Sequence, residues 1–314
     1  MNHFAKIFGL LIFLLSGCNT LDRGEGDLLY KIYEDKAGPG IEVGDFVGLV
    51  AVEKTESDSV TYTSHDYDRP SYMYLGNPIF KGDLLGGLKL LSLGDSALLK
   101  INLDSMVNHG RQRPVNHIGK YLVYNIRVTD VLKRGSLTDS AFTEKVNAFV
   151  RKKQTEWMKA QPYKIRDFIK KSNMKLQITP GGLYYHVSKM GEGISPSKGD
   201  TVELNYRISL MSGKLLDSTY PADGKMQIDD DFQKPDGPLR WYAGLGRRFY
   251  TPGFNQAMLM FPKGTKAKLI IPSHLAYGAE GGKGIPPFIP LIVDLEILEI
   301  IPKKGEITTL NSHL

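Results

Sequence analysis

The residues between positions 213 and 294 carry the side chains best suited to chemistry in this chain. One carboxylate, Asp217, is followed by aromatic and aliphatic residues at Trp241, Phe254, Tyr277 and Ile285. Aromatic side chains bury large apolar areas, and tyrosine also keeps a polar tip, so this set favours an apolar cleft with polar groups at its mouth. Such a cleft suits holding an apolar ring, such as that of proline, rather than cutting a bond.

Other reactive groups lack partners at a useful spacing. The single cysteine and the scattered serines offer no nucleophile paired with a base. The glycine-rich stretch 278–284 lacks the spacing of a phosphate-binding loop and does not open a helix. The acidic triplet 229–231 has no matching ligand series, and His109 and His117 lack partners for zinc. The sequence therefore predicts neither a metal nor a cofactor.

The positive charge is spread along the chain. The formal net charge is +6 over 314 residues, and the basic residues occur as isolated pairs or triplets such as Arg247-Arg248 and Lys303-Lys304. A nucleic-acid-binding protein more often gathers its basic residues into one stripe or patch. We therefore expect a solvated basic surface and no nucleic-acid partner.

The N-terminus has the pattern of an export signal. Lys6 precedes a short apolar run, residues 7–15, and small residues lead to the only cysteine, Cys18. The run is too short to span a bilayer. Leu15-Ser16-Gly17-Cys18 also resembles the lipobox of bacterial lipoproteins, which implies acylation of Cys18. We expect a signal peptide at 1–17 and a lipidated tether at 18–26, and a plain signal peptide with an incidental cysteine is the alternative.

The remaining pattern predicts an α+β fold made of two β-rich domains. The first covers residues 27–136, with one short helix near residues 84–91, and the second covers 174–302, with a helix near 254–260. Residues 303–314 read as a tail.

A helical connector is expected between the domains, over residues 137–173. Thr138, Asp139 or Ser140 can cap its first helix, and apolar residues recur there at spacings of three and four. We expect Pro162 to begin a second helix that runs from Tyr163 to Lys171.

The two β-rich regions repeat each other. Adding 170 to the residue number superposes Gly94 on Gly264, Ala97 on Ala267 and Ile101 on Ile271, and also Leu75-Gly76 on Leu245-Gly246. Similarity on the scale of a domain indicates duplication of one fold.

The second region resembles an FKBP-type peptidyl-prolyl cis-trans isomerase domain. The resemblance implies a bent antiparallel sheet wrapped across one short helix, with the site between helix and sheet. It also assigns the site. The matching catalytic positions are Tyr206, Asp217, Trp241, Thr251, Phe254 and Tyr277, and the matching substrate-binding positions are Leu216, Tyr250, Ile285 and Val293. In this family the backbone N–H at the Thr251 position binds substrate.

Four features depart from the family pattern. Leu216 and Val293 stand where the family usually has phenylalanine, and Phe254 replaces the usual tryptophan at the pocket floor. Residues 221–237 form an insertion, which reads either as a flap over the cleft or as an unrelated surface loop.

The first copy lacks the ring-bearing and acidic residues of the second. By the same comparison, Thr63, Ser71, Leu84 and Val107 stand where Asp217, Trp241, Phe254 and Tyr277 stand. We therefore expect a degenerate domain that serves as a scaffold, a dimerisation surface or a client contact.

The resemblance implies an isomerase that acts on X-Pro bonds of exported proteins during folding. It would face the periplasm or sit on the outer membrane of a bacterial cell envelope, held by its lipid anchor, with proline-containing polypeptides as partners. The alternative is a non-catalytic chaperone or interaction module that uses the same cleft. A homodimer through the first domain or the connector helices is also left open.

Overall fold

The computed structural model describes residues 20–113, 119–220, 238–244, 251–282 and 284–303. The expected signal peptide, Cys18, the insertion 221–237, Tyr250 and nearly all of the tail lie outside these ranges. The chain forms two compact units. Unit 1 consists of Met1–Tyr62 and Tyr72–Lys133, and unit 2 consists of Thr63–Ser71 and Arg134–Leu314. Within the described ranges, no helix has both the length and the apolar character needed to cross a membrane.

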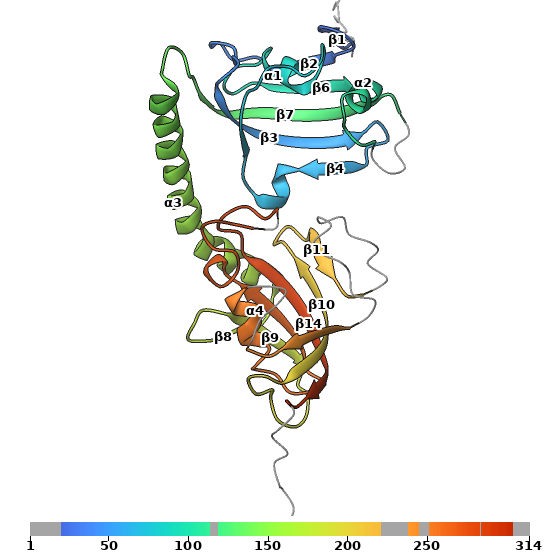
Figure 1. The fold of residues 1–314 in the computed structure, drawn as a ribbon, viewed down its shortest axis with the longest axis vertical. Helices are drawn as coiled ribbons and strands as arrows, with labels where there is room; N and C mark the ends of the chain where they lie inside the picture. The colour runs from blue at the N-terminus through green and yellow to red at the C-terminus, as the bar shows by residue number, and fades with distance from the viewer. Residues whose placement is uncertain (1–19, 114–118, 221–237, 245–250, 283, 304–314) are drawn as a thin grey trace, which may run out of the picture. The chain divides into compact units, whose positions relative to one another are not determined.

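Unit 1 is built on one antiparallel sheet (Figure 1). Its strands run in the order β1-β2-β6-β7-β3-β4, with β5 paired to β3. The strands are β1 (Asp22–Arg23), β2 (Leu29–Glu34), β3 (Phe46–Thr55), β4 (Val60–Thr63), β5 (Ser71–Tyr74), β6 (Ser96–Asn102) and β7 (Tyr121–Leu132), and the helices are α1 (Leu84–Leu88) and α2 (Leu103–Asn108). Alternate residues of β6 are buried, as expected for a strand with one face on the core.

Unit 2 repeats this arrangement. Its strands run in the order β8-β9-β13-β14-β10-β11, with β12 paired to β10. The strands are β8 (Gln177–Ile178), β9 (Tyr184–Lys189), β10 (Thr201–Ser209), β11 (Leu215–Ser218), β12 (Leu239–Tyr242), β13 (Lys266–Ile271) and β14 (Leu291–Ile301). The helices are α3 (Asp139–Ser172) and α4 (Pro252–Ala257), with 3-10 turns η1 (Ser64–Tyr67) and η3 (Ser273–Leu275).

Corresponding hydrogen bonds confirm the predicted α+β fold and its duplication. The Gly94 N–H donates to Val128 O, and the Gly264 N–H donates to Ile297 O, at 3.0 and 2.8 Å. Both β3 and β10 carry an irregularity in their pairing with β7 and β14 at the same place along the strand. Identical strand order and shared local defects are what duplication of one fold produces.

One part of the predicted alignment is wrong. The Leu75 N–H donates to Asp45 O and the Ala243 N–H donates to Asp200 O, both at 2.8 Å, so Leu75 corresponds to Ala243 and not to Leu245. Trp241 lies two residues before Ala243, and Met73 lies two residues before Leu75. Met73, rather than the expected Ser71, therefore occupies the Trp241 position. A constant shift fails here because the connections between the strands differ in length in the two copies.

The expected pair of connector helices is a single helix, α3, with Pro162 inside it. Proline removes one backbone donor and costs about 3 kcal/mol in a helix interior. The helix continues because both sides of Pro162 are held: Gln161 is buried, and Ile165 is 2% exposed and packs with Ile270 and Ile292 of the sheet. Tertiary packing thus outweighs the local signal.

The boundaries of the units also differ from those expected. Helix α3 belongs to unit 2, and so does the segment 63–71, which lies between β4 and β5 in the chain. Both therefore form part of the body that carries the predicted site.

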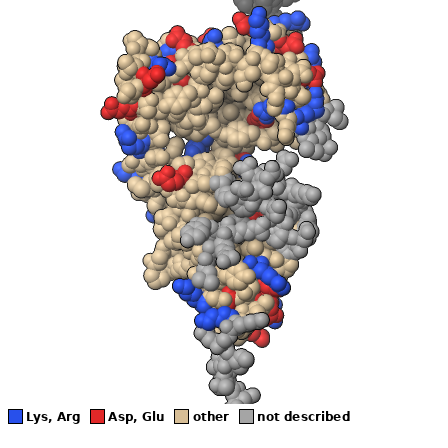
Figure 2. Space-filling view, in the orientation of Figure 1, with Lys and Arg blue, Asp and Glu red and all other residues tan. Residues whose placement is uncertain are grey.

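Basic and acidic side chains are mixed on the described surface shown in Figure 2. Ion pairs of the described residues include Lys266 with Glu296 at 3.0 Å, and Lys133 with the buried Asp45 at 2.8 Å.

Candidate active site

Three aromatic rings meet in the core of unit 2, each from a different element. Tyr206 lies on β10, Trp241 on β12 and Phe254 on α4, and each is 1–2% exposed. The Phe254 ring is edge-on to both others, with centroid separations of 5.1 Å to Trp241 and 6.1 Å to Tyr206. Edge-to-face pairs at these distances are favourable. The rings predicted from separate parts of the sequence therefore form one cluster.

The strands place these rings by simple alternation. In β10 the even-numbered residues 202 to 208 are buried, which turns Tyr206 inward. Trp241 lies opposite Val202, and Val293 of β14 lies opposite Ile208. Val293 is fully buried and Leu216 is 5% exposed, so both expected replacements for phenylalanine line the same core.

The Tyr206 hydroxyl holds the predicted carboxylate. It donates to Asp217 Oδ2 at 2.7 Å, and the Ser218 N–H donates to Asp217 Oδ1 at 2.8 Å. Strand β11 pairs with β10 so that Asp217 lies opposite Ile208, next to an irregularity in the pairing. A bond from a hydroxyl to an ionised carboxylate is among the stronger hydrogen bonds in proteins. Asp217 is therefore fixed in orientation although it is half-buried.

Tyr277 packs against the core and lies close enough to Asp217 to be affected by its charge. Its ring is half-buried and packs against the same hydrophobic cluster. Burial raises the pKa of the Tyr277 phenol, and the negative charge of Asp217 raises it further. The hydroxyl consequently stays protonated near neutral pH and is available as a hydrogen-bond donor.

Ile285 closes one side of the site on a tight turn. It is 8% exposed, and it exchanges two backbone hydrogen bonds of 2.9 Å with Gly282. Gly281 has a φ of +69°, and a Cβ there would lie 2.4 Å from Ile285 O. Only glycine fits this position without moving backbone.

Thr251 stands at the N-terminus of α4. It is 2% exposed and precedes Pro252, a residue favoured at the first helical position. Among the described residues its backbone N–H has no hydrogen-bond acceptor. Tyr250 lies outside the described residues.

In the described part of unit 1, the positions that correspond to Tyr206, Trp241 and Phe254 carry no rings. In its sheet, Ala51 pairs with Ile126 as Tyr206 pairs with Leu295, so alanine takes the place of Tyr206. Helix α1 contains only leucine and glycine, and a Cβ on Gly87 would lie 2.8 Å from Leu99 Cδ1. The helix therefore approaches the sheet closely at Gly87.

The positions expected to replace the site residues in unit 1 have other roles. Leu84 and Val107 pack against the core of unit 1. Thr63 caps the 3-10 turn η1 by accepting a bond from the His65 N–H at 3.2 Å, and η1 belongs to unit 2.

A polar group in unit 1 was missed by sequence reasoning. Glu53 lies opposite Tyr124, where unit 2 has Ile208 opposite Val293. Arg111 Nη2 lies 2.7 Å from Glu53 Oε1, and its Nη1 donates to the Tyr124 hydroxyl at 3.4 Å. The sequence did offer one signal for this group: Glu53 falls at a position of β3 that should face the core, where a carboxylate needs a partner such as Arg111. The wall that is apolar in unit 2 is thus charged in unit 1.

Within the described part of the chain, no group of three or more His, Cys, Asp or Glu side chains is placed to hold a metal ion.

Comparison with known proteins connects the site to a family. Residues 192–298 match the family model of FKBP-type peptidyl-prolyl cis-trans isomerase. The chain is 34% identical over 135 residues to the FKBP-type peptidyl-prolyl cis-trans isomerase FkpA of Escherichia coli K12, covering 43% of this chain and 43% of that protein. It therefore spans less than half the length of that relative.

Two further matches are also FkpA proteins, one by sequence and one by structure. FkpA of Aeromonas hydrophila is 27% identical over 228 residues, which is 72% of this chain and 71% of that protein. The crystal structure of E. coli FkpA matches with a TM-score of 0.39 and 28% identity, covering 53% of this chain and 75% of that one. The segment 192–298 includes every predicted site residue from Tyr206 to Val293. By the family model, residues 192–298 of unit 2 match the FKBP-type peptidyl-prolyl cis-trans isomerase family.

Proposed function

We propose that unit 2 catalyses cis-trans isomerisation of X-Pro bonds. The observation that carries this proposal is the buried cluster of Tyr206, Trp241 and Phe254 beside the carboxylate that Tyr206 holds. The cluster combines a large apolar surface with fixed polar groups, as a site for a proline ring requires. It contains no nucleophile, and isomerisation needs none.

The barrier to the reaction explains the apolar site. Rotation about the amide faces about 18–20 kcal/mol because planarity carries resonance, and the uncatalysed step takes tens to hundreds of seconds. The twisted amide has lost resonance and is less polarised than the planar one. A dry, apolar environment therefore favours the transition state over the ground state.

The polar groups around the cluster would orient the substrate. The Tyr277 hydroxyl or the Thr251 N–H would donate to a substrate carbonyl, and Asp217 would keep the mouth of the site in shape rather than transfer a proton. Leu216, Ile285 and Val293 would supply apolar wall, with Tyr250 beside Thr251.

A peptide assay tests this proposal. The full chain from Asn19, wild type and with Tyr277→Phe or Asp217→Val, is added to an X-Pro peptide whose trans form alone is cleaved by a coupled protease. We expect acceleration by the wild type and a loss of about tenfold or more in kcat/KM for each variant. If the wild-type protein leaves the rate of isomerisation at its uncatalysed value, the proposed isomerase activity is refuted.

A non-catalytic module that holds proline-containing segments is the second candidate. Leu216 and Val293 keep it open, because each replaces a phenylalanine usual in the family with a smaller side chain in the wall. Restoring the rings with Leu216→Phe and Val293→Phe distinguishes the two. If the wild type binds a proline peptide but does not accelerate its isomerisation, and the variant with both phenylalanines does accelerate it, the wild-type domain is a binding module.

We also propose that the protein is exported and held at a bacterial membrane through acylated Cys18, where it acts on proline-containing clients. The sequence order of Lys6, the apolar run and Leu15-Ser16-Gly17-Cys18 supports this. Membrane fractionation of the wild type and of Cys18→Ala tests it, since only the wild type should remain with the membrane. A homodimer through unit 1 or α3 is tested by light scattering on the same protein.

A further inference from the structure

Two loops border the proposed site, and one backbone hydrogen bond joins them. The first runs from Ser273 to Gly278 and carries Tyr277, and the second runs from Ile285 to Pro290. The Phe288 N–H donates to Gly278 O at 2.8 Å. Phe288 itself has a φ of +58°, which is unfavourable for a residue with a side chain. Such a conformation persists only where surrounding contacts hold it.

Gln161 of α3 supplies such contacts to both loops. Gln161 is only 8% exposed. Its Nε2 donates to Phe288 O and to Ser273 Oγ, both at 2.8 Å, and its Oε1 accepts from the Ser273 N–H at 3.0 Å. One side-chain amide therefore bridges the first residue of the Tyr277 loop and the strained residue of the Ile285 loop.

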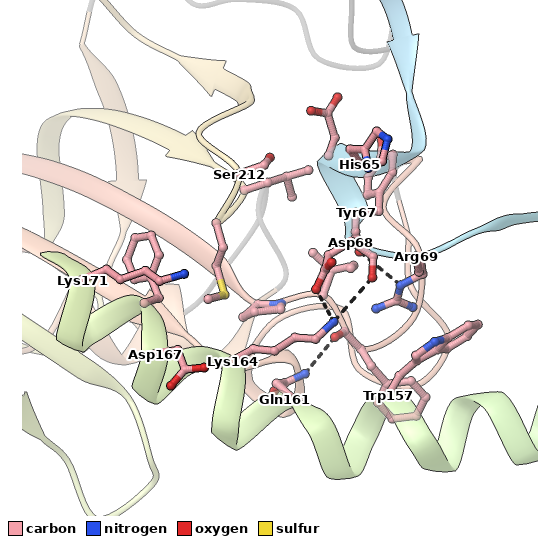
Figure 3. Close-up of a pocket in the computed structure, with 17 residues that line it drawn as sticks. His65, Tyr67, Asp68, Arg69, Trp157, Gln161, Lys164, Asp167, Lys171 and Ser212 are labelled. Carbon is pink, nitrogen blue, oxygen red and sulfur yellow. Dashed lines mark hydrogen bonds and ion pairs between the residues drawn. The ribbon is translucent and has the colours of Figure 1, made fainter. Parts of the chain in front are cut away.

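Arg69 holds the neighbouring carbonyl. Its Nη1 donates to Pro287 O at 2.7 Å, and its guanidinium lies 4.2 Å from the centroid of the Trp157 ring. Trp157 is one helical turn before Gln161, so α3 supports both contacts from one face (Figure 3). A pocket of about 450 Å³ lies beside them. Arg69 belongs to the segment 63–71, which is part of unit 2.

We propose that Gln161, assisted by Arg69, is a positioning residue that sets the geometry of the Tyr277 and Ile285 loops. Helix α3 thereby forms part of the functional site, although it lies outside the matched segment 192–298. The proposal rests on the proposed function in so far as both loops face substrate. Gln161 acts on the substrate only through the two loops and does not touch it.

Three variants of the full chain from Asn19 separate the contacts. Gln161→Met has a similar length and loses every hydrogen bond. Gln161→Glu keeps an acceptor for the Ser273 N–H but loses the donor to Phe288 O. Gln154→Met is the matched control, because it makes the same change on the same helix at a residue with no hydrogen bond to either loop. Arg69→Met tests the second contact.

The kinetic readout distinguishes positioning from loss of folded protein. Gln161→Glu should raise KM about fivefold with little change in kcat, because the Ile285 wall contacts substrate in both ground and transition states. Gln161→Met should also lower kcat, for a total loss of about tenfold in kcat/KM, because it releases the Tyr277 loop as well. A protein that is merely less stable would show lower apparent kcat at unchanged KM, and that result overturns the proposal.

Hydrogen exchange gives a readout that needs no activity. The amides of Ile285, Phe288 and Ile289 should exchange faster in Gln161→Glu and Arg69→Met, and the amides of 273–278 should also exchange faster in Gln161→Met. Gln154→Met should exchange like the wild type. Unchanged exchange in both Gln161 variants refutes the positioning role even if the wild type is inactive. If the wild type has no isomerase activity but exchange is faster in the Gln161 variants, the positioning role is supported and only the proposed isomerase activity is refuted.

Discussion

The bond between Tyr206 and Asp217 permits a quantitative test of how the site is held. The hydroxyl lies 2.7 Å from Asp217 Oδ2; Tyr206 is 1% exposed, so the donor side of this bond is shielded from water, whereas Asp217 is half-buried. A hydrogen bond to a charged group contributes about 1.5–3 kcal/mol. Tyr206→Phe should therefore lower the free energy of unfolding of unit 2 by about 2 kcal/mol.

A double-mutant cycle isolates that bond. Asp217→Val removes the same interaction together with the contact from the Ser218 N–H. Because each single variant already lacks the bond, Tyr206→Phe with Asp217→Val should be less destabilised than the sum of the two by about 2 kcal/mol.

Tryptophan fluorescence provides the assay. Both tryptophans of the chain, Trp157 and Trp241, lie in unit 2, so urea unfolding followed by their emission reports on that unit. With a slope near 2 kcal/mol per molar urea, Tyr206→Phe should move the midpoint by about 1 M. A coupling free energy below about 0.5 kcal/mol would show that the bond does not hold the carboxylate, and the account of the site given above would be wrong.

Three further predictions follow from the site. Phe254→Ala should cost about 3–5 kcal/mol in the same urea assay, since it empties the space between Tyr206 and Trp241; a cost below about 1 kcal/mol would contradict the ring cluster. Gly281→Ala should lower kcat/KM far more than Gly284→Ala: both glycines have positive φ, but a Cβ lies 2.4 Å from Ile285 O at the first and meets nothing within 4 Å at the second. Equal effects would show that the turn is not rigid. The pKa of Tyr277 is raised in the folded state, so the unfolded chain loses this proton first as the pH rises. The urea midpoint of the wild type should therefore change with pH as that of Tyr277→Phe does below the ordinary tyrosine pKa of about 10, and should fall more steeply than that of the variant above it. Midpoints that run parallel from pH 8 to 11 would rule out burial of this phenol.

Much of unit 2 could be predicted because its signals are local or repeat in order. The alternation of Val202, Leu204 and Tyr206 identifies an inward face of a strand, and the glycines at 94 and 264 mark the same bend twice. The order of the motifs and the family resemblance together placed Phe254 and Trp241 in one site, and in the structure their ring centroids lie 5.1 Å apart.

The errors arose where distant contacts override a local rule. Pro162 is a sound signal for a helix start, yet α3 runs through it because Gln161 and Ile165 are buried on either side. Met73, not Ser71, matches Trp241, because a constant shift cannot follow loops of different length. The bridge made by Gln161 had no local signal, since a glutamine in a polar helix reads as solvated surface.

By itself, the sequence determined the duplicated α+β fold and the residue types of the site, because burial patterns and glycine positions are written into neighbouring residues. Only the tertiary structure decided that α3 and the segment 63–71 belong to the body carrying the site, and that Gln161 joins its two loops. These facts depend on contacts between residues more than one hundred positions apart, such as Gln161 with Ser273. No local pattern encodes such a contact, since it forms only when both elements are already folded.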